Sequence, residues 1–232
     1  APVAPIAEAG GPYVINEGQS LVLAGSATNP GGGPLTYLWD LGNDGQFDDA
    51  SGATPTVPWS VLAGLGVPSN GTARTIQLRV DGGAAGFSTD TATLTITNLA
   101  PVANAGGPYT INEGQGLLLS GSGTDAGGDV LTYEWDLDND GQFDDAGSAT
   151  PSVPWSVLVG LGLPSDGTAR TVQLRVTDSD GASHTAGTTL TIRNLPPVAM
   201  PGGPYIIGEG ADLVLAGAGS DPGNDGLTYA WD

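Results

Sequence analysis

The sequence contains a ten-residue acidic stretch, residues 136–145, whose oxygen-bearing side chains are spaced to suit a divalent cation. Carboxylates stand at its first, third, fifth, ninth and tenth positions, and glycine stands at the sixth. Calcium takes roughly six to eight oxygen ligands, which a tight loop supplies from alternate residues while a glycine permits the sharp turn. We therefore predict a calcium site with these ligands: Asp136, Asp138, Asp140, Asp144, Asp145 and the backbone carbonyl of Gln142.

The spacing matches the start of an EF-hand loop, although the expected glutamate at position 12 is replaced by Gly147 and no helical pattern flanks the loop. We therefore expect the loop without the EF-hand fold, with Asp144 or Asp145 in place of the bidentate ligand. The alternative is a solvated acidic turn, since Asp and Asn are good turn formers. The repulsion among five neighbouring carboxylates favours a bound cation.

The first copy of this stretch lies one repeat earlier, at residues 40–49, where Gly42 stands at the position of Asp138. The missing carboxylate predicts weaker binding, or a water molecule in its place. The predicted ligands of this copy are Asp40, Asp44, Gln46, Asp48 and Asp49.

A further acidic set lies in predicted turns and could form another calcium site at a joint between modules, as in cadherin-like arrays. Its members are Glu113, Asp125, Asp129, Asp178 and Asp180. The first copy lacks the four aspartates, which are replaced there by Asn29, Gly33, Gly82 and Ala84. Ordinary polar turns are therefore the favoured interpretation of this set.

These loops belong to an internal repeat of 96 residues. The motif GGPY begins at residues 10, 106 and 202, and LTYxWD begins at residues 35, 131 and 227. The predicted organisation is a joint at 1–9, repeats at 10–99 and 100–195, and a partial repeat at 196–232. We expect an excerpt of a longer array. The alternative is a head-to-tail filament in which another chain completes the third copy, so neighbouring copies are the expected partners.

Each repeat shows about seven short segments of alternating apolar residues separated by turn residues, which predicts an all-β, immunoglobulin-like sandwich. Within 130–136, Leu131, Tyr133 and Trp135 are expected to face the core, whereas Thr132, Glu134 and Asp136 face outward. The segment 150–162 is expected to give one or two irregular edge strands. The joints are short and rich in proline, which predicts modules arranged as a rod. The other strands predicted in the second copy are 108–112, 116–122, 169–177 and 188–194.

The stretches YLWDLGNDG (37–45) and YEWDLDNDG (133–141) resemble the YxWDFGDG core motif of PKD (polycystic kidney disease) domains, and 170–183 is similar to a late strand and turn of that family. The resemblance covers the chain as two and a half copies and is strongest to acidic repeats of large bacterial surface proteins. It implies an immunoglobulin-like sandwich, an extracellular or cell-surface location, and a role as spacer, adhesion or binding module. PKD domains need not bind metal, so the calcium prediction rests on the residues themselves.

Composition excludes several functions. The net charge is −20, from 25 acidic and 5 basic residues, which repels nucleic acid and anionic membranes. No run of roughly 18 apolar residues could span a membrane. The chain has no cysteine, a single histidine and no nucleophile-elbow motif, so we expect no catalytic residues and no enzyme activity.

Trp59 and Trp155 lie in the repeated motif VPWSVL and could stack on sugar rings, although packing against the sandwich edge is favoured because Val and Leu flank them. Asn70 begins a glycosylation sequon. The predicted function is a structural repeat of an extracellular, calcium-stabilised rod or fibre on a bacterial surface. The alternative is an accessory module of a large secreted protein that binds polysaccharide or protein.

Overall fold

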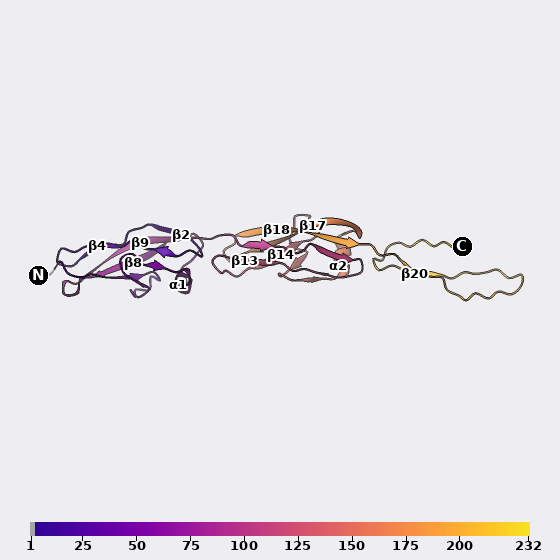
Figure 1. Ribbon diagram of the computed structural model, residues 1–232, viewed down its shortest axis with the longest axis horizontal. Coiled ribbons are helices and arrows are strands. Elements are labelled where there is room, and N and C mark those ends of the chain that lie inside the picture. The colour runs from indigo at the N-terminus through magenta and orange to yellow at the C-terminus, as the bar shows by residue number, and fades with distance from the viewer. Residues whose placement is uncertain (1–2) are drawn as a thin grey trace. The chain divides into compact units, whose positions relative to one another are not determined.

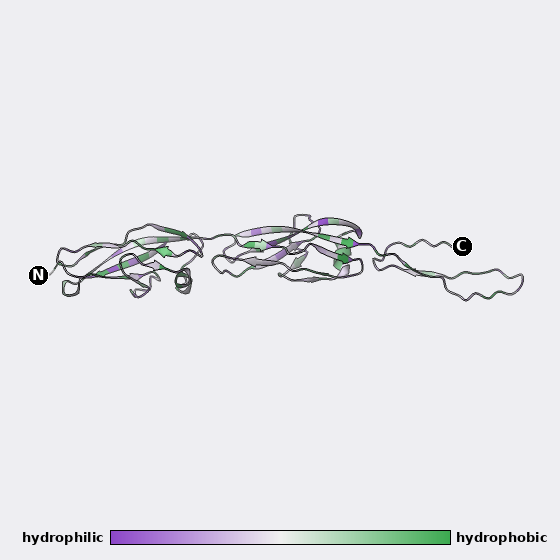
Figure 2. Cartoon of the chain, in the orientation of Figure 1, coloured by the Kyte–Doolittle hydropathy of each residue, from purple (hydrophilic) through white to green (hydrophobic). Residues whose placement is uncertain are grey.

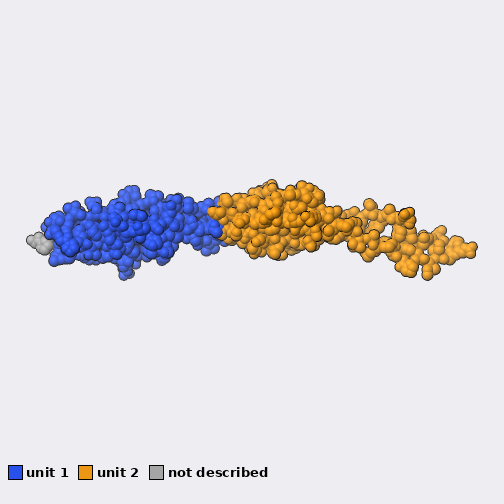
Figure 3. Space-filling view, in the orientation of Figure 1, with its two compact units in different colours: residues 1–101, 124–131, 177–183 blue, residues 102–123, 132–176, 184–232 orange. Residues whose placement is uncertain are grey.

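The computed structural model describes residues 3–232, which form two compact units (Figure 3). Unit 1 contains the chain up to Pro101 together with Thr124–Leu131 and Thr177–Ser183. Unit 2 contains Val102–Gly123, Thr132–Val176 and His184–Asp232. Two turns that belong to the second repeat by sequence are therefore counted with the body of the first.

Unit 1 is a sandwich built on a five-stranded sheet with the order β2-β9-β8-β5-β6. Figure 1 labels β2, β9 and β8 of this sheet. Strand β2 runs parallel to β9, whereas β9, β8, β5 and β6 pair antiparallel. The strands are β2 (Tyr13–Asn16), β5 (Thr36–Asp40), β6 (Ala50–Ser51), β8 (Arg74–Asp81) and β9 (Phe87–Thr97). Two short pairs complete the unit, β1 (Ile6–Glu8) with β4 (Ser26–Thr28) and β3 (Leu21–Val22) with β7 (Thr56–Val57).

Unit 2 repeats this topology with the sheet order β11-β18-β17-β14-β15. These strands are β11 (Tyr109–Asn112), β14 (Thr132–Asp136), β15 (Ala146–Gly147), β17 (Asp166–Thr177) and β18 (Ser183–Arg193). The short pairs are β10 (Val102–Asn104) with β13 (Ser122–Thr124) and β12 (Leu117–Leu118) with β16 (Ser152–Val153). The third copy contributes one pair, β19 (Val198–Met200) with β20 (Ala218–Ser220).

The core forms from alternate residues of these strands, as Figure 2 shows by the alternation of hydrophobic and hydrophilic positions. Ile76, Leu78 and Val80 of β8 are fully buried. Trp39 is also fully buried, and its indole Nε1 donates to the carbonyl of Gly52 at 3.0 Å. Its copy Trp135 donates in the same way to Ser148, also at 3.0 Å. The predicted all-β, immunoglobulin-like sandwich with a core tryptophan is confirmed for both modules.

The repeated GGPY motif has a structural role. The Tyr13 hydroxyl donates to the Ala9 carbonyl at 2.7 Å and accepts from the Ala24 amide at 2.9 Å. Gly10 has a φ of +70°, and a Cβ there would lie 2.6 Å from the Ala24 carbonyl oxygen, so only glycine fits. Tyr109 makes the equivalent bonds in unit 2.

Two parts of the fold differ from the sequence prediction. The segment 150–162 holds a short helix, α2 (Trp155–Gly160), after β16, and α1 (Trp59–Gly64) is its copy. Pro154 precedes the helix, where its missing N–H costs nothing, and Leu158 is buried, so burial outweighs the β-propensity of the valines. Residues 6–8, expected in a joint, form β1, because Ala7 and Ala9 enter the core.

Among residues 3–232, neither six-residue helix has the length or hydrophobicity needed to cross a membrane.

Candidate metal centres

Asp136, the first predicted ligand, ends strand β14 directly after the core tryptophan. Its side chain is fully buried, so the expectation that it faces outward is wrong. The strand ends at Asp136, and one carboxylate oxygen, Oδ2, accepts from the Gly141 amide at 3.0 Å. The other oxygen, Oδ1, is buried without a hydrogen-bond partner. An ionised oxygen in that state is costly unless a cation compensates it.

Three of the predicted ligands come together in this loop. Asp136, Asp138 and Asp140 each place one carboxylate oxygen within 4.8 Å of the other two. Two oxygens on opposite sides of one calcium ion lie about 4.6–5.2 Å apart, twice the usual calcium–oxygen distance. The group is therefore compact enough to share one ion.

The other predicted ligands of this loop lie outside that group. Asp145 closes the loop, because its Oδ2 accepts from the Leu137 amide at 2.6 Å and from the Asp138 amide at 3.4 Å. Burial raises the pKa of Asp145, and the charges of Asp138 and Asp144 raise it further, against the effect of the amide bonds. Asp144 is exposed, and Gln142 donates its amide and its side chain to Asp140.

In the first copy of the loop, both oxygens of the buried carboxylate accept hydrogen bonds from backbone amides of the loop. Asp40 is fully buried, and its two oxygens accept from the amides of Asp44 at 3.2 Å and Gly45 at 2.8 Å. Asp49 accepts from the Leu41 and Gly42 amides. The Arg74 guanidinium donates to the Gly42 carbonyl. Within the described residues, 40–49 hold no group of three clustered carboxylates; Asp48 is exposed and Gln46 donates its amide to Asp44.

The further acidic set forms with a different glutamate than expected. Asp125 and Asp129 lie with Glu17, one repeat earlier in the chain, and one oxygen of each lies within 4.8 Å of the others. All three residues belong to unit 1. Glu113 instead lies with Asp221 and Asp225, all in unit 2. The expected grouping of Glu113 with Asp125 is therefore wrong, because each glutamate lies beside a turn that belongs to the next repeat.

Glu17 is 1% exposed, and its Oε1 accepts from the Leu99 amide at 2.8 Å. Burial raises its pKa, and the charges of Asp125, Asp129 and Asp178 add to this, whereas the Leu99 amide lowers it. Burial also raises the pKa of Asp129, with further contributions from Asp125 and Asp180. The raised pKa values of Glu17 and Asp129 mean that these two carboxyl groups ionise less readily without a counter-ion.

Asp178 and Asp180 fix the neighbouring turn. Asp178 accepts from the amides of Asp180 and Ala182 and, through Oδ2, from the Asn98 side chain at 3.1 Å. Asp180 accepts from the Ser69 hydroxyl at 3.0 Å. These two carboxylates are bonded to protein donors and lie outside the group formed by Glu17.

The remaining predicted positions lie on the surface or at its edge. Trp59 is half-buried against the core, and its Nε1 donates to the Gly127 carbonyl at 3.0 Å. Trp155 is half-buried at the start of α2. Asn70 is exposed in the stretch between α1 and β8, where its Oδ1 accepts from the Thr72 amide.

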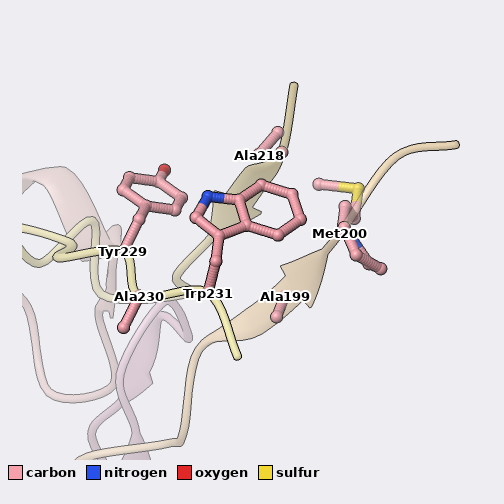
Figure 4. A pocket seen from close by; sticks show the side chains of 8 residues that line it. Ala199, Met200, Ala218, Tyr229, Ala230 and Trp231 are labelled. Carbon is pink, nitrogen blue, oxygen red and sulfur yellow. The ribbon is translucent and has the colours of Figure 1, made fainter. Parts of the chain in front are cut away.

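A shallow apolar pocket of about 100 Å³ lies in the third copy, where the Trp231 ring lies between Tyr229 and Met200 in Figure 4. Alanines and glycine complete its lining together with Pro201. It contains no carboxylate and is separate from the acidic groups.

Comparison with known proteins identifies part of the chain. Residues 2–60 match the family described as the PKD domain. Chitinase A of Pseudoalteromonas piscicida is 28% identical over 145 residues, which are 59% of this chain and 16% of that protein. The rat homologue of the dyslexia-associated protein KIAA0319 is 32% identical over 140 residues, 57% of this chain and 12% of that protein. The chain thus spans less than a fifth of either relative.

Two solved structures are also among the proteins similar to this chain. The PKD1 domain of Vibrio anguillarum Epp is 28% identical, with a TM-score of 0.30. The match covers 41% of this chain and 96% of that domain. The three N-terminal domains of the bacteriophage RB49 outer capsid protein Hoc are 14% identical, with a TM-score of 0.36, over 95% of this chain and 69% of that one.

Proposed function

We propose that this chain, a tandem of immunoglobulin-like modules that includes a PKD domain, is a structural repeat of a secreted or cell-surface protein and that calcium stabilises its modules. PKD modules are accessory, non-catalytic domains typical of secreted proteins such as chitinase A. The observation that carries the calcium proposal is Asp136, a fully buried carboxylate with an unpartnered oxygen beside Asp138 and Asp140.

The chemistry of the donors supports calcium over other ions. The three clustered ligands are carboxylates, which suit hard cations, and the chain has no cysteine to favour zinc or copper. The net charge of −20 raises the local concentration of divalent cations around the loop. A bound ion would connect the end of β14 to the tip of the loop and offset the repulsion among the carboxylates.

The finer proposal is a calcium-stabilised rod or fibre on a bacterial surface. It is supported by the strict 96-residue period and by the short, proline-rich stretches between repeats. Similarity to a bacterial chitinase agrees with a bacterial origin.

A thermal melt of the metal-free chain, with and without added calcium, tests the stabilisation. A ligand at a hundredfold excess over its Kd stabilises a fold by about 2.7 kcal/mol. We therefore expect the melting temperature to rise by about 10 °C or more in calcium. Asp136→Asn should remove most of the rise in melting temperature that this loop contributes. Asp44→Asn lies in the first copy of the loop, whose buried Asp40 already has protein donors, and should leave the rise unchanged. Equal melts in both conditions, with no calcium bound, would contradict the proposal.

A second candidate is an accessory module that binds polysaccharide, favoured by the similarity to part of a chitinase and by the half-buried Trp155. Retention on insoluble chitin, lost in Trp155→Ala, would support it. Trp59 is a weaker candidate for sugar stacking, because it packs on the core and bonds to Gly127. A spacer should not be retained on the polymer.

A further inference from the structure

We infer that Glu17, Asp125 and Asp129 form a second divalent-cation site, distinct from the loop at Asp136, and that Glu113, Asp221 and Asp225 repeat it in unit 2. The ion would fasten the turn 124–131 to the body of unit 1. The inference deepens the proposed calcium-stabilised role and rests on it for the identity of the ion.

The first observation is that each of the three clustered side chains has a buried oxygen without a partner. Glu17 is 1% exposed, and its Oε1 is used by the Leu99 amide while its Oε2 has no hydrogen-bond partner. Oδ2 of Asp125 and Oδ2 of Asp129 are likewise buried and unpartnered. Buried carboxylate oxygens are normally hydrogen-bonded or bound to metal. Three such oxygens on three clustered side chains therefore call for a shared cation.

The turn is shaped so that these oxygens remain free. Oδ1 of Asp125 accepts from the amides of Gly127, Gly128 and Asp129, at 2.8, 2.9 and 3.1 Å. These bonds use one oxygen to hold the turn and leave Oδ2 without a donor. The arrangement resembles a ligand fixed in place before its ion arrives, which lowers the entropy cost of binding.

Close packing brings the turn against Glu17. A Cβ on Gly127 would lie 2.4 Å from the Glu17 Oε2, so the glycine lets this carboxylate lie directly against the turn. A Cβ on Gly18 would lie 2.7 Å from the Ala126 carbonyl oxygen. The Trp59 indole donates to the Gly127 carbonyl. The unpartnered Glu17 oxygen therefore points directly into the turn that carries the two aspartates.

A similar arrangement recurs in unit 2, one repeat later in the sequence. Glu113 is 1% exposed, its Oε1 accepts from the Leu195 amide at 2.7 Å, and its Oε2 is unpartnered. A Cβ on Gly223 would lie 2.3 Å from that Oε2. Oδ1 of Asp221 accepts from the Gly223 amide, as Asp125 does from Gly127. A feature that costs stability without an ion, yet occurs twice, is expected to have a use.

Calcium suits the group better than magnesium or zinc. One oxygen from each side chain lies within 4.8 Å of the others, which is close enough to share one calcium ion. Magnesium usually keeps several waters and takes only one or two carboxylates. Three carboxylates leave about three to five positions for water or backbone carbonyls. Zinc prefers nitrogen or sulfur ligands, and none belongs to the group.

Calcium titration of the full 232-residue chain by calorimetry tests this inference. Glu17→Gln removes a charge but keeps an oxygen that can accept from the Leu99 amide. We expect it to lose about one bound calcium ion per chain. Glu113→Gln should lose the corresponding ion of unit 2. Glu8→Gln is the matched control, because Glu8 is exposed on β1 and belongs to no acidic group, so its stoichiometry should equal that of the original chain.

Asp136→Asn separates this site from the loop. If it loses an ion that Glu17→Gln retains, the two sites are independent. If Glu17→Gln and Glu113→Gln bind as many ions as the control, the second site does not exist, whatever happens to the loop. If Asp136→Asn binds as many calcium ions as the control while the two glutamate variants each lose one, the loop proposal fails and this inference stands.

Hydrogen exchange gives a local measurement that a general loss of stability would not reproduce. Calcium should slow exchange of the amides in 124–131 and of Leu99 in the original chain and in Asp136→Asn. It should have no such effect in Glu17→Gln. Should Glu17→Gln fail to fold, as judged by circular dichroism in chelator, Asp129→Asn at the half-buried position replaces it. Calcium-induced protection that persists in both variants would overturn the inference.

Discussion

The turns 40–49 and 136–145 follow the same strand in their modules and share most of their sequence, but their buried aspartates are bonded differently. In the first turn, the Asp44 amide donates to Asp40 Oδ1. In the second turn, the equivalent amide, of Asp140, donates to Asp138 Oδ1 at 3.1 Å instead. Asp138 stands where the first turn has Gly42. One added carboxylate thus takes the donor away and leaves Asp136 Oδ1 unpartnered.

The arginines near the two turns also differ. Arg74 donates to the Gly42 carbonyl and places a positive charge at the first turn. Its copy Arg170 donates to Asp166 Oδ2 at 2.8 Å. Asn70 occupies the position of Asp166 in the first repeat and offers no charge to hold an arginine. In the second turn the guanidinium of Arg175 lies over the Phe143 ring, 4.4 Å from its centroid, but is paired with Glu134. The comparison teaches that one added carboxylate, Asp138, is enough to leave a buried oxygen of Asp136 free for the proposed ion.

The largest effect should come from exchanging the residue that distinguishes the turns. Asp138→Gly should weaken calcium binding at the second turn by at least about tenfold, because it removes a ligand and returns the Asp140 amide to Asp136. Gly42→Asp should create binding at the first turn. A Cβ there would meet Asp49 at 3.5 Å, which is an ordinary contact. Calorimetric titration measures both changes, and no gain in Gly42→Asp would show that Gly42 is not the deciding residue.

A smaller effect should appear in the pH dependence of stability without metal. The pKa values of Glu17, Asp129 and Asp145 are raised by burial above their ordinary values of 4.5 for Glu and 3.8 for Asp. The folded chain therefore binds protons more tightly than the unfolded chain. Stability should be highest below the ordinary values and should fall as pH rises through the raised ones.

Thermal melts of resin-treated, metal-free chain across this range measure the fall, and added calcium should reduce it. The lowered pKa of the exposed Asp166, caused first by its bond to the Thr168 amide, acts in the opposite direction. Asp145→Asn should flatten the part of the fall that belongs to the second turn. A metal-free stability that rises steadily with pH would contradict this account.

The smallest effect should come from releasing Arg170. Asp166→Asn introduces the residue that the first repeat has at this position, Asn70, and frees the Arg170 guanidinium to approach the second turn. A unit charge near a divalent ion, largely screened by water and salt, should lower calcium affinity by about threefold. Calorimetry at low and high salt measures this, and the difference should shrink at high salt. Arg79→Gln is the control, since Arg79 is paired with Asp81, which belongs to none of the acidic groups described above.

Much of the fold was predictable because it depends on local patterns. The alternation in 130–136 predicted that Trp135 faces the core, and its side chain is fully buried. The helices α1 and α2 were not predictable in the same way. A short run such as WSVLVG suits either element until the burial of Leu158 and the preceding proline decide between them.

The candidate sites also differ in whether local sequence or tertiary packing determines them. The sequence by itself determined the candidate site at 136–145, because its proposed ligands are neighbours in the chain and their spacing controls their geometry. Only the tertiary structure decided that Asp136 is buried and that Glu17, rather than Glu113, meets Asp125 and Asp129. The repeated INEG at residues 15 and 111 marks both glutamates equally. Residues more than a hundred positions apart meet only through the path of the folded chain, and a pattern of spacing does not contain that path.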